Sequence, residues 1–356
     1  MRFLTQPLSG MQRYAEELCT ALDDVLAGDR GYLGGAPVIG LKPGGPSRSR
    51  DWKAIELRST GRLKGHAWEQ VELAHAARDG ILISLAGSGP LAHPRHVLAL
   101  HDANLVVNPQ FYSRGYRSFH GFVRPRLARR ARALLTISGF SRGELARHYK
   151  VPEARLQLVP DSAEHILGVP SDTGILTRSG LVPGRYALCV GNQSPNKNIA
   201  LAIDAFAKVT PEGMRLAIAG GTPAALARAE TSSAPWLTTL GRVTDGELRA
   251  LYENSAAFVF PSLYEGFGVP PLEAMSLGCP VISSDSSAMP EVLGDAALFF
   301  RSGDVEACAA RLREVLGLDP AGRQRMVEAG RGRAAQYRWR DSADRLARVL
   351  QTLEAA

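Results

Sequence analysis

Short apolar runs alternate with stretches of helical periodicity along the second half of the chain. Thr244 and Glu247 have the spacing of a capping box at the start of one such helix. Short continuous apolar runs are typical of strands buried on both faces of a parallel sheet. The predicted strands lie at 186–191, 215–221, 236–241, 256–262, 279–284 and 297–300. The predicted helices lie at 198–209, 222–230, 247–255 and 270–278.

The first half shows a less regular form of the same alternation. Residues 2–5 are a predicted strand, and the helix that follows places Tyr14, Leu18 and Leu22 on one face. Residues 28–65 are rich in Gly, Pro, Ser and Arg, which we interpret as a mobile loop region with one or two strands. Further strands are predicted at 80–87, 95–102, 133–138 and 156–160, with helices at 119–133 and 144–149, the second opened by a capping box of Ser141 and Glu144.

Strand–helix alternation in both halves predicts an α/β protein with two parallel, doubly wound sheets. A segment with little periodicity, 163–184, is the predicted linker. We therefore expect domains at 1–168 and 169–335, followed by a C-terminal helix at 336–356 that crosses back to the first domain. Ligands of such sheets bind at the carboxyl ends of the strands, so the expected site is the cleft between the domains.

Composition narrows the class of protein. The chain has 356 residues, of which 45% are hydrophobic and 22% charged, as in globular proteins that are not membrane-embedded. The N-terminus has no signal-peptide h-region, and no apolar stretch reaches the length that spans a bilayer, so we expect a cytoplasmic protein. The four cysteines are far apart in apolar surroundings, which favours buried thiols over metal ligands or disulfides.

The positive charge is concentrated in one segment. The formal net charge is +7, and residues 111–150 alone carry nine arginines and one lysine against one acid, Glu144. A basic surface attracts an anionic membrane or a phosphorylated ligand, although an arginine-rich helix that only faces solvent explains the segment equally well. The segment lacks the motifs of nucleic-acid-binding modules, so we expect no nucleic-acid partner.

The most informative motif is PSLYEGFGVPPLEAMSLGCPVIS at 261–283. Glu265, Gly266 and Gly268 lie in the predicted turn between a strand and a helix that begins at Pro271. Pro270 offers no side-chain oxygen to cap that helix. The backbone N–H groups of 268, 269, 272 and 273 are therefore predicted to be free to bind a phosphate at the positive end of the helix dipole.

Two carboxylates flank this predicted phosphate site. Glu273, in the first turn of the helix, is also explained by a favourable interaction with the helix dipole. Glu265 lies in the turn itself and has no such explanation. Carboxylates would repel a phosphate unless they bind other groups, and the hydroxyls of a sugar and a ribose are suitable donors to them.

Five blocks of sequence together resemble the group-1 family of retaining glycosyltransferases, which have the GT-B fold of two Rossmann-like domains facing across a cleft. The resemblance covers nearly the whole chain, and the spacing of Glu265 and Glu273 alone would be a weak signal. The blocks occur in the family's order, at 66–102, 134–160, 190–206, 240–262 and 260–300.

This resemblance implies roles for the two carboxylates. Glu265 matches the residue that lies against the transferred sugar and its phosphate, and Glu273 matches the residue that holds the ribose. The backbone of Phe267, Gly268 and Val269 matches the segment that binds the sugar and the diphosphate of the donor.

The resemblance also implies positive charge at the leaving group. Lys197 matches a basic residue that neutralises the diphosphate, and the alternative is a surface lysine before a helix. Many relatives have an arginine shortly before it, where this chain has Asn192 and Gln193, and Arg242 is a possible replacement. Asn192 and Arg242 are therefore predicted donor-binding residues, and the backbone at Val243 matches the position where the nucleotide base is bound.

In the N-terminal half, which the resemblance makes the acceptor-binding domain, His101 matches a histidine beside the donor sugar. A strand-end histidine with a purely structural role is the alternative. Gly10 matches a glycine loop near the donor phosphate and the acceptor. The segment before Gly10 is shorter than the family's, and Asp161 replaces the Asn-Gly common at the linker.

The implied activity is transfer of a hexose, with mannose favoured, from a nucleotide sugar such as GDP-mannose with retention of configuration. The acceptor would be a glycan or a lipid-linked glycan in the synthesis of a surface polysaccharide. We expect no metal and no cofactor beyond the donor, with Glu265, His101 and Lys197 as catalytic residues. The protein would be cytoplasmic, with possible peripheral contact between residues 111–150 and the inner face of the membrane. A sugar phosphorylase, a nucleotide-sugar epimerase or a non-catalytic nucleotide-sugar-binding protein are the alternatives.

Overall fold

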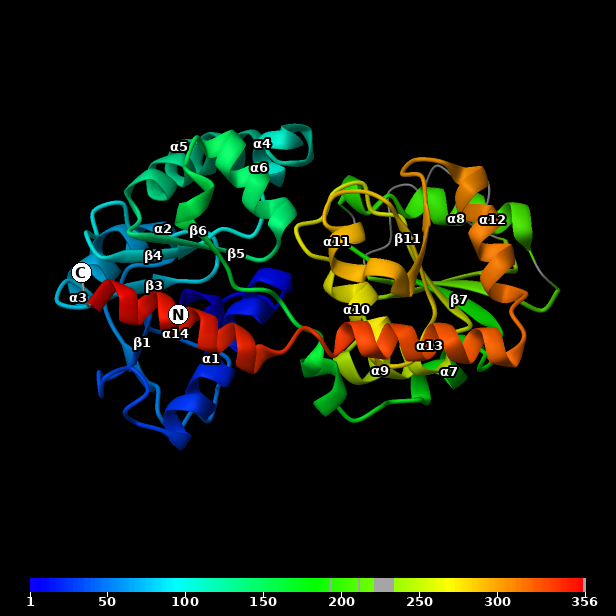
Figure 1. The fold of residues 1–356 in the computed structure, drawn as a ribbon, viewed down its shortest axis with the longest axis horizontal. Coiled ribbons are helices and arrows are strands. Elements are labelled where there is room, and N and C mark those ends of the chain that lie inside the picture. The colour runs from blue at the N-terminus through cyan, green and yellow to red at the C-terminus, as the bar shows by residue number, and fades with distance from the viewer. Residues whose placement is uncertain (193, 211, 221–233, 355–356) are drawn as a thin grey trace. The chain divides into compact units, whose positions relative to one another are not determined.

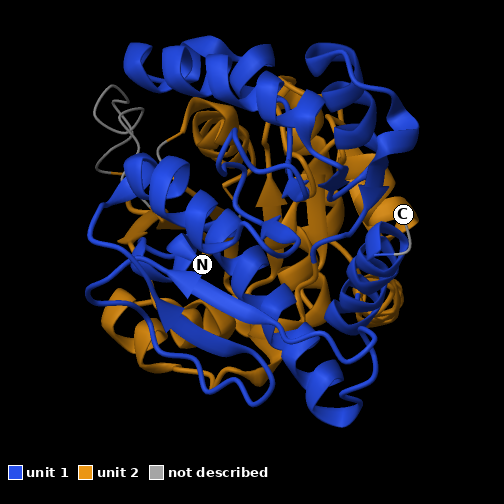
Figure 2. Cartoon of the chain, turned by 90° about the vertical axis from the view of Figure 1, so that its left-hand side faces the viewer, with its two compact units in different colours: residues 1–161, 338–356 blue, residues 162–337 orange. Residues whose placement is uncertain are grey.

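The chain divides into two compact units, each with its own parallel sheet. The computed structural model describes residues 1–192, 194–210, 212–220 and 234–354. Unit 1 comprises Met1–Asp161 and Arg338–Ala356, and unit 2 comprises Ser162–Tyr337 (Figure 2). Both units alternate strands and helices along the chain, which confirms the predicted α/β class.

Unit 2 contains a six-stranded sheet in which all strands are parallel. Its strand order is β12-β11-β10-β7-β8-β9, so β7 and β10 lie side by side near the centre and β9 forms one edge. Two of these strands, β7 and β11, are labelled in Figure 1. The central strands are almost fully buried, as their continuous apolar sequences predict. The strands are β7 (Tyr186–Gly191), β8 (Arg215–Gly220), β9 (Leu237–Gly241), β10 (Ala257–Phe260), β11 (Val281–Ser284) and β12 (Ala297–Phe300).

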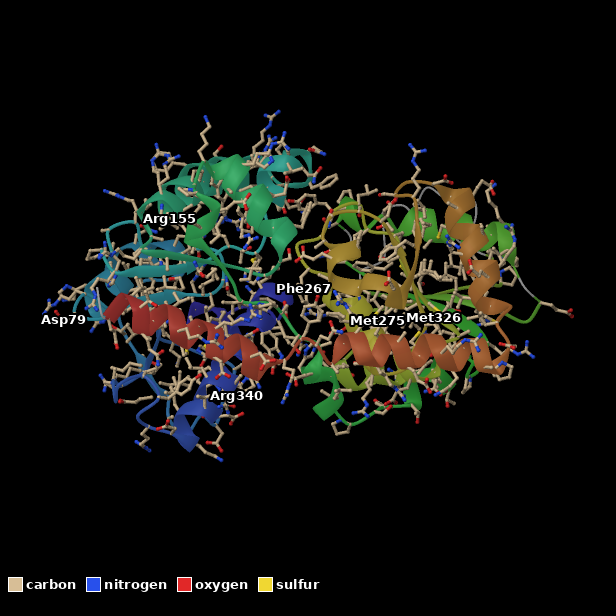
Figure 3. The ribbon with its side chains drawn as sticks, viewed as in Figure 1. Asp79, Arg155, Phe267, Met275, Met326 and Arg340 are labelled. Carbon is tan, nitrogen blue, oxygen red and sulfur yellow. The ribbon has the colours of Figure 1, made fainter. Side chains whose placement is uncertain are left out.

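Helices cover both faces of this sheet. α8 (Ile199–Val209) packs against α12 (Val305–Leu316), and α10 (Val269–Ser276) packs against α13 (Pro320–Ala334). Met275 of α10, labelled in Figure 3, lies so close to α13 that a Cβ atom on Gly330 would come within 3.2 Å of its side chain. The remaining helices are η5 (Glu164–Gly168), α7 (Gly174–Ser179), η6 (Pro195–Lys197), α9 (Asp245–Asn254), α11 (Met289–Leu293) and η8 (Gly294–Ala296). The helix predicted at 222–230 lies outside the described residues.

Unit 1 contains a four-stranded parallel sheet and a separate parallel pair. The sheet has the order β3 (Leu82–Ser84), β4 (His96–Ala99), β5 (Ala133–Thr136) and β6 (Leu156–Leu158). The pair is β1 (Ile39–Lys42) with β2 (Glu56–Ser59), within the region predicted as loops with one or two strands. A cavity of about 680 Å³ lies in this unit and is lined by residues of β1, β3 and the N-terminal segment, among others.

The helices of unit 1 include the C-terminal one. α14 (Trp339–Glu354) packs along α1 (Gly10–Gly28) within this unit. The basic segment forms α5 (Arg114–Arg130) and α6 (Gly139–Tyr149), and α5 begins one turn earlier than predicted. The shorter helices are α2 (Gly65–Trp68), η2 (Glu69–Leu73), α3 (Ala74–Ala76), α4 (Asn104–Val107), η3 (Pro109–Phe111) and η4 (Glu153–Arg155).

The strand predicted at 2–5 is wrong, because this segment is a 3-10 helix, η1 (Arg2–Thr5). Two of its carbonyl groups accept hydrogen bonds from Arg48 instead of from a neighbouring strand. The guanidinium of Arg48 donates to the carbonyl of Phe3 at 2.7 Å, and the Arg48 N–H donates to the carbonyl of Leu4 at 2.9 Å. A partner more than 40 residues away therefore decides the local conformation.

The two predicted capping boxes have different outcomes. The box of Thr244 and Glu247 at the start of α9 is confirmed, with both reciprocal hydrogen bonds present. The box of Ser141 and Glu144 is wrong, because α6 begins at Gly139 with Ser138 as its N-cap. The hydroxyl of Ser138 accepts the N–H of Ser141 at 3.0 Å, so the helix starts one turn before the predicted position.

All four cysteines are buried and unpaired, as predicted, and burial raises the pKa of the Cys189 thiol to about 12. None of the helices within the described ranges combines the length and the apolar character needed to cross a bilayer.

Candidate functional site

Lys197 and Glu265 form the centre of the site in unit 2. Lys197 ends η6, directly after β7, and Glu265 lies in the turn between β10 and α10. Because β7 and β10 are parallel neighbours, their carboxyl ends meet at one edge of the sheet. The Nζ atom of Lys197 lies 2.6 Å from Oε1 of Glu265, and the hydroxyl of Ser262 donates to the same oxygen at 2.6 Å.

This ion pair is partly buried yet reachable from solvent. The side chains of Lys197 and Glu265 are 19% and 13% exposed. The Nζ atom also lies 5.5 Å from the ring centre of Phe260, where the ring face favours a cation. A charged pair with limited exposure is held in place and still available to a ligand.

Asn196 ties the two loops that carry this pair. Its side-chain amide donates to the carbonyl of Tyr264 at 3.1 Å, and its own carbonyl accepts the N–H of Leu263 at 2.7 Å. Gly191, at the end of β7, leaves room for the lysine, because a Cβ atom there would lie 3.2 Å from Cβ of Lys197. The geometry of the pair is thus fixed by its neighbours in the sequence as well as by the sheet.

The helix of the glycine–proline turn begins two residues earlier than predicted. α10 starts at Val269, with Gly268 as an N-cap that has no side-chain hydrogen bond. The four unpaired positions at this helix start are therefore 268–271, so Leu272 and Glu273 lie beyond them. The prediction that 272 and 273 offer free N–H groups is wrong, and since Pro270 and Pro271 have none, only the N–H groups of Gly268 and Val269 remain.

Gly268 is required at this helix start for two reasons. Its φ is 91°, which L-residues with side chains rarely adopt, and a Cβ atom there would lie 2.4 Å from the Cε atom of Met289. The preceding Phe267, labelled in Figure 3, is buried. It packs edge-on against Tyr337 with ring centres 5.1 Å apart. The backbone of 267–269 is thus anchored on one side, and its two N–H groups mark the start of the helix dipole.

Glu273 is buried beneath this turn and has two partners of its own. Its Oε1 atom lies 2.8 Å from Nε2 of His165 in η5, and its Oε2 atom accepts the hydroxyl of Tyr252 in α9 at 3.0 Å. Burial and the neighbouring carboxylate raise the pKa of Tyr252 well above its usual range. Sequence reasoning missed both partners, because only the tertiary fold brings them to Glu273. Its role as a ribose-binding residue stays a prediction.

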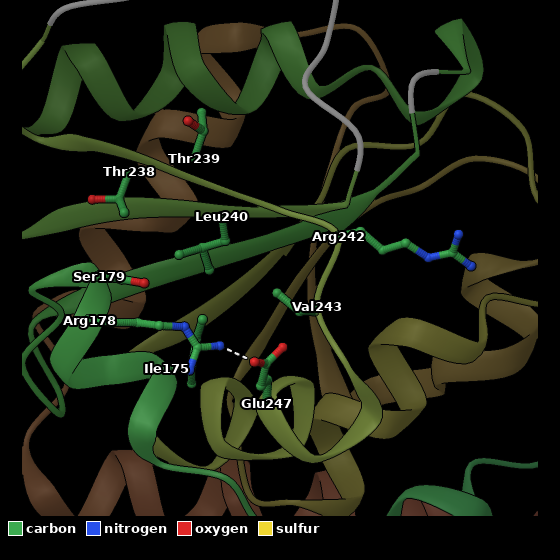
Figure 4. Close-up of a pocket in the computed structure, with 9 residues that line it drawn as sticks. All are labelled: Ile175, Arg178, Ser179, Thr238, Thr239, Leu240, Arg242, Val243 and Glu247. Atoms are coloured by element: carbon green, nitrogen blue, oxygen red, sulfur yellow. Dashed lines mark hydrogen bonds and ion pairs between the residues drawn. The ribbon is translucent and has the colours of Figure 1, made fainter.

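Arg242 and Val243 follow the edge strand β9 and border a cavity of about 370 Å³. The far wall of this cavity is an ion pair between Arg178 and Glu247, and Figure 4 shows the side chain of Arg242 extending away from that pair. Asn192, just after β7, accepts the N–H of Ser194 at 3.0 Å through its side-chain oxygen. The neighbouring Gln193 lies outside the described residues.

In unit 1, His101 and the start of α1 lie together. His101 follows β4, is buried, and has its ring centre 4.5 Å from that of Tyr14, one turn after Gly10. Its Nε2 atom lies 2.9 Å from the carbonyl oxygen of Leu85, which places a proton on Nε2 because a carbonyl only accepts. Burial lowers the pKa of His101, so the ring is neutral near pH 7.

Gly10 opens α1 with space around it. Its N-cap, Ser9, accepts no backbone N–H of the helix through its side chain, because its hydroxyl donates to the side-chain oxygen of Gln12 instead, and a Cβ atom on Gly10 would meet no atom within 4 Å. Of the predicted catalytic residues, Lys197 and Glu265 thus meet after the ends of β7 and β10 in unit 2, and His101 follows the end of β4 in unit 1. Among the residues that the structure describes, no three His, Cys, Asp or Glu side chains are grouped as metal ligands.

Comparison with known proteins gives a consistent picture. The sequence model of the family "Glycosyl transferases group 1" matches residues 184–317, which include Lys197, Glu265 and Glu273. The O-antigen chain mannosyltransferase B of Escherichia coli is 32% identical over 258 residues, covering 69% of this chain and 67% of that protein. The serotype-specific mannosyltransferase WbdA of Escherichia coli is 28% identical over 72% of this chain, which spans only 34% of that relative.

The fold has solved counterparts as well. A sucrose-phosphate synthase from Thermosynechococcus elongatus superimposes with a TM-score of 0.73 over 98% of this chain and 94% of that chain, at 19% identity. This likeness shows the GT-B fold. With the family match and the mannosyltransferase similarity, it establishes that this chain is a glycosyltransferase and belongs to the group-1 glycosyl transferase family.

Proposed function

We propose that this enzyme transfers mannose from GDP-mannose to a glycan or lipid-linked glycan during synthesis of a surface polysaccharide, with retention of configuration. The observation that carries the proposal is the ion pair of Lys197 and Glu265 beside the uncapped start of α10. The names of the relatives, both mannosyltransferases and one of them for O-antigen, support the choice of sugar and of product.

The residues of the turn suit the two ends of a nucleotide sugar. The ammonium of Lys197 and the N–H groups of Gly268 and Val269 would stabilise the negative charge that develops on the leaving diphosphate. The free lone pairs of Glu265 would accept hydroxyl groups of the sugar. Each group is fixed before the ligand binds, which lowers the cost of ordering it.

The proposed sugar transfer proceeds in one displacement, without a covalent intermediate between the sugar and the enzyme. The bond between the anomeric carbon and the diphosphate oxygen breaks, and the acceptor oxygen forms its bond to the same face of that carbon. The acceptor proton passes to an oxygen of the departing diphosphate. His101, neutral and buried, would hold a sugar hydroxyl close to the anomeric carbon.

The nucleotide end of the donor completes the proposed site. Glu273 would hold the ribose hydroxyls, for which one of its two present partners, His165 or Tyr252, has to share or yield a carboxylate oxygen. The backbone at Val243 would bind the base, with Asn192 and Arg242 near the phosphates and Gly10 beside the donor phosphate.

We propose further that the reaction needs no divalent metal, since the charge of Lys197 and the dipole of α10 supply electrostatic stabilisation at the diphosphate. Turnover of the purified enzyme should be unchanged after treatment with EDTA. Loss of turnover that returns when magnesium is added would contradict this part of the proposal.

The basic helix α5 supports peripheral contact with the cytoplasmic face of a membrane. Phe119 and Phe122 are 36% and 53% exposed on this arginine-rich helix, and the guanidinium of Arg126 lies 3.5 Å from the ring centre of Phe122. Exposed aromatic rings beside cations suit the interface of an anionic bilayer. Liposome flotation should increase with the content of anionic lipid, and equal flotation on neutral vesicles would refute the contact.

A direct test of the donor is a thermal-shift panel with GDP, UDP and ADP and their sugars. GDP and GDP-mannose should raise the melting temperature most, because a ligand of the native state stabilises it. Turnover of GDP-mannose should then require a glycan acceptor. Phosphate-dependent cleavage would identify a phosphorylase, and turnover without any acceptor would identify an epimerase.

A further inference from the structure

Arg124 is a buried cation that no carboxylate neutralises directly. It belongs to α5, is only 8% exposed, and no Asp or Glu among the described residues forms an ion pair with it. One guanidinium nitrogen, Nη2, donates to the hydroxyl of Tyr116 at 3.2 Å. Its Nε–H is buried without an acceptor at hydrogen-bonding geometry in the described part of the chain, and the phenol of Tyr149 lies close to the guanidinium. A buried cation with an unsatisfied donor is costly, so a functional partner is the natural explanation.

The surroundings of Arg124 favour an anion. Gly87 lies shortly after the end of β3 and has a φ of 72°. A Cβ atom on Gly87 would lie 3.5 Å from Nη2 of Arg124 and 3.7 Å from the Sδ atom of Met11. Met11 is in the first turn of α1, whose start has no side-chain cap. A group held here would therefore face the guanidinium and the positive end of a 19-residue helix together.

Arg124 is also a neighbour of His101. Burial is the main reason that the pKa of His101 is lowered, and the positive charge of Arg124 lowers it further. The charged and titratable groups that interact with Arg124 are the carboxylate of Asp102, the imidazoles of His101 and His120, and the phenols of Tyr112, Tyr116 and Tyr149. Of these groups, only the carboxylate of Asp102 would repel an anion. Asp102 attracts Arg124 from a distance but forms no ion pair with it.

We propose that Arg124 binds a phosphate group of the acceptor beside His101, so that the enzyme selects acceptors carrying a phosphate or diphosphate. The planar guanidinium offers parallel N–H groups that match two phosphate oxygens. The donor diphosphate already has Lys197 and the start of α10 in unit 2, and Gly10, proposed above to lie beside the donor phosphate, brings no charged side chain, so the cation of Arg124 is left for the second substrate. The assignment to an acceptor rests on the proposed function, whereas binding of phosphate by Arg124 does not.

The binding test titrates inorganic phosphate into protein that is saturated with GDP, at constant ionic strength, with thermal shift as the readout. The wild type should be stabilised, and Arg124→Gln should bind phosphate about tenfold more weakly or worse, because one charge-assisted contact is lost. Arg126→Gln, on the exposed side of the same helix, is the matched control and should respond like the wild type. Equal phosphate responses of the wild type and Arg124→Gln would overturn the proposal.

Arg124→Lys is a second variant that tests the proposal if Arg124→Gln does not fold. Arg124→Lys keeps the charge but loses the paired N–H groups, so phosphate should still bind, with a several-fold higher Kd. An unchanged Kd in Arg124→Lys would refute the role of the guanidinium in binding phosphate.

The substrate test compares a phosphorylated acceptor with the same acceptor after phosphatase treatment. The wild type should have a lower KM for the phosphorylated form, and Arg124→Gln should lose that preference while its Kd for GDP stays the same. If Arg124→Gln instead loses GDP binding, the anion is the donor diphosphate and the acceptor assignment is wrong. If GDP binds neither protein, the proposed function fails, and the phosphate titration repeated without GDP then tests the binding of phosphate by Arg124 separately.

Discussion

Replacement of Lys197 by methionine tests the central electrostatic claim. The substitution removes the ammonium but keeps an unbranched side chain of similar length, so packing against Phe260 changes little. Among the described residues, the carboxylate of Glu265 then keeps only the hydrogen bond from Ser262. It would face the leaving diphosphate without its counter-charge, and repulsion would add to the loss of attraction.

The expected magnitude follows from the exposure of the pair. With 19% of the Lys197 side chain exposed, the effective dielectric constant lies well below that of water. Two unit charges about 4 Å apart in a medium of dielectric about 20 attract each other by about 4 kcal/mol. Loss of one preorganised group at a developing negative charge typically lowers kcat by about 10²–10³-fold. We therefore expect a fall of that size in kcat for Lys197→Met.

The assay is steady-state transfer to an excess of acceptor, with product detected by mass spectrometry. Lys208 provides the matched control, because its Nζ atom also lies 2.6 Å from a carboxylate oxygen, that of Glu306, but the two side chains are 46% and 70% exposed. Lys208→Met should leave kcat unchanged, and Lys197→Arg should restore part of the activity lost in Lys197→Met.

Stability measurements separate a catalytic effect from a folding effect. Desolvation of the two charges offsets much of their attraction in this partly buried pair, so its net contribution to folding is about 1 kcal/mol or less and Lys197→Met should melt within a few degrees of the wild type. A folded Lys197→Met enzyme that retains kcat within about threefold of the wild type would refute the role assigned to this charge.

Three further predictions concern stability. Tyr252→Phe leaves a buried oxygen of Glu273 without its donor and should lower the unfolding free energy in urea by about 1–3 kcal/mol; no change would mean that water satisfies the carboxylate. Burial lowers the pKa of His96 from 6.5 to about 4, so below pH 6.5 the unfolded chain takes up a proton that the folded chain refuses. The unfolding free energy should then fall by about 1.4 kcal/mol per pH unit until the folded pKa is reached, and His96→Gln should remove that part of the pH dependence. Parallel curves of unfolding free energy against pH for the wild type and His96→Gln would contradict this prediction. Gly268→Ala and Gly303→Ala both strain a positive φ, but only the first creates a clash, so it should destabilise by about 1–3 kcal/mol more; equal losses would contradict the clash.

The sequence by itself determined the class of fold and most strand positions. Strands such as β7 and β10 consist of continuous apolar residues, and burial on both faces demands that composition whatever the neighbours are. The capping box at Thr244 was equally readable, since both of its hydrogen bonds join residues three positions apart. The motif around Glu265 and Glu273 identified the turn that carries the site.

Only the tertiary structure decided which groups meet in that turn. The partners Lys197 and Glu265 are 68 residues apart, and the contact between them depends on β7 and β10 being neighbours in the sheet. His165 reaches Glu273 across 108 residues, and Arg48 bonds the carbonyl groups of a segment whose own sequence predicts a strand. The periodicity of apolar residues shows which side of an element is buried, because each buried position favours an apolar residue independently of the other positions. A hydrogen bond or ion pair depends on two residues at once, and the position of the second is set by the packing of the whole unit.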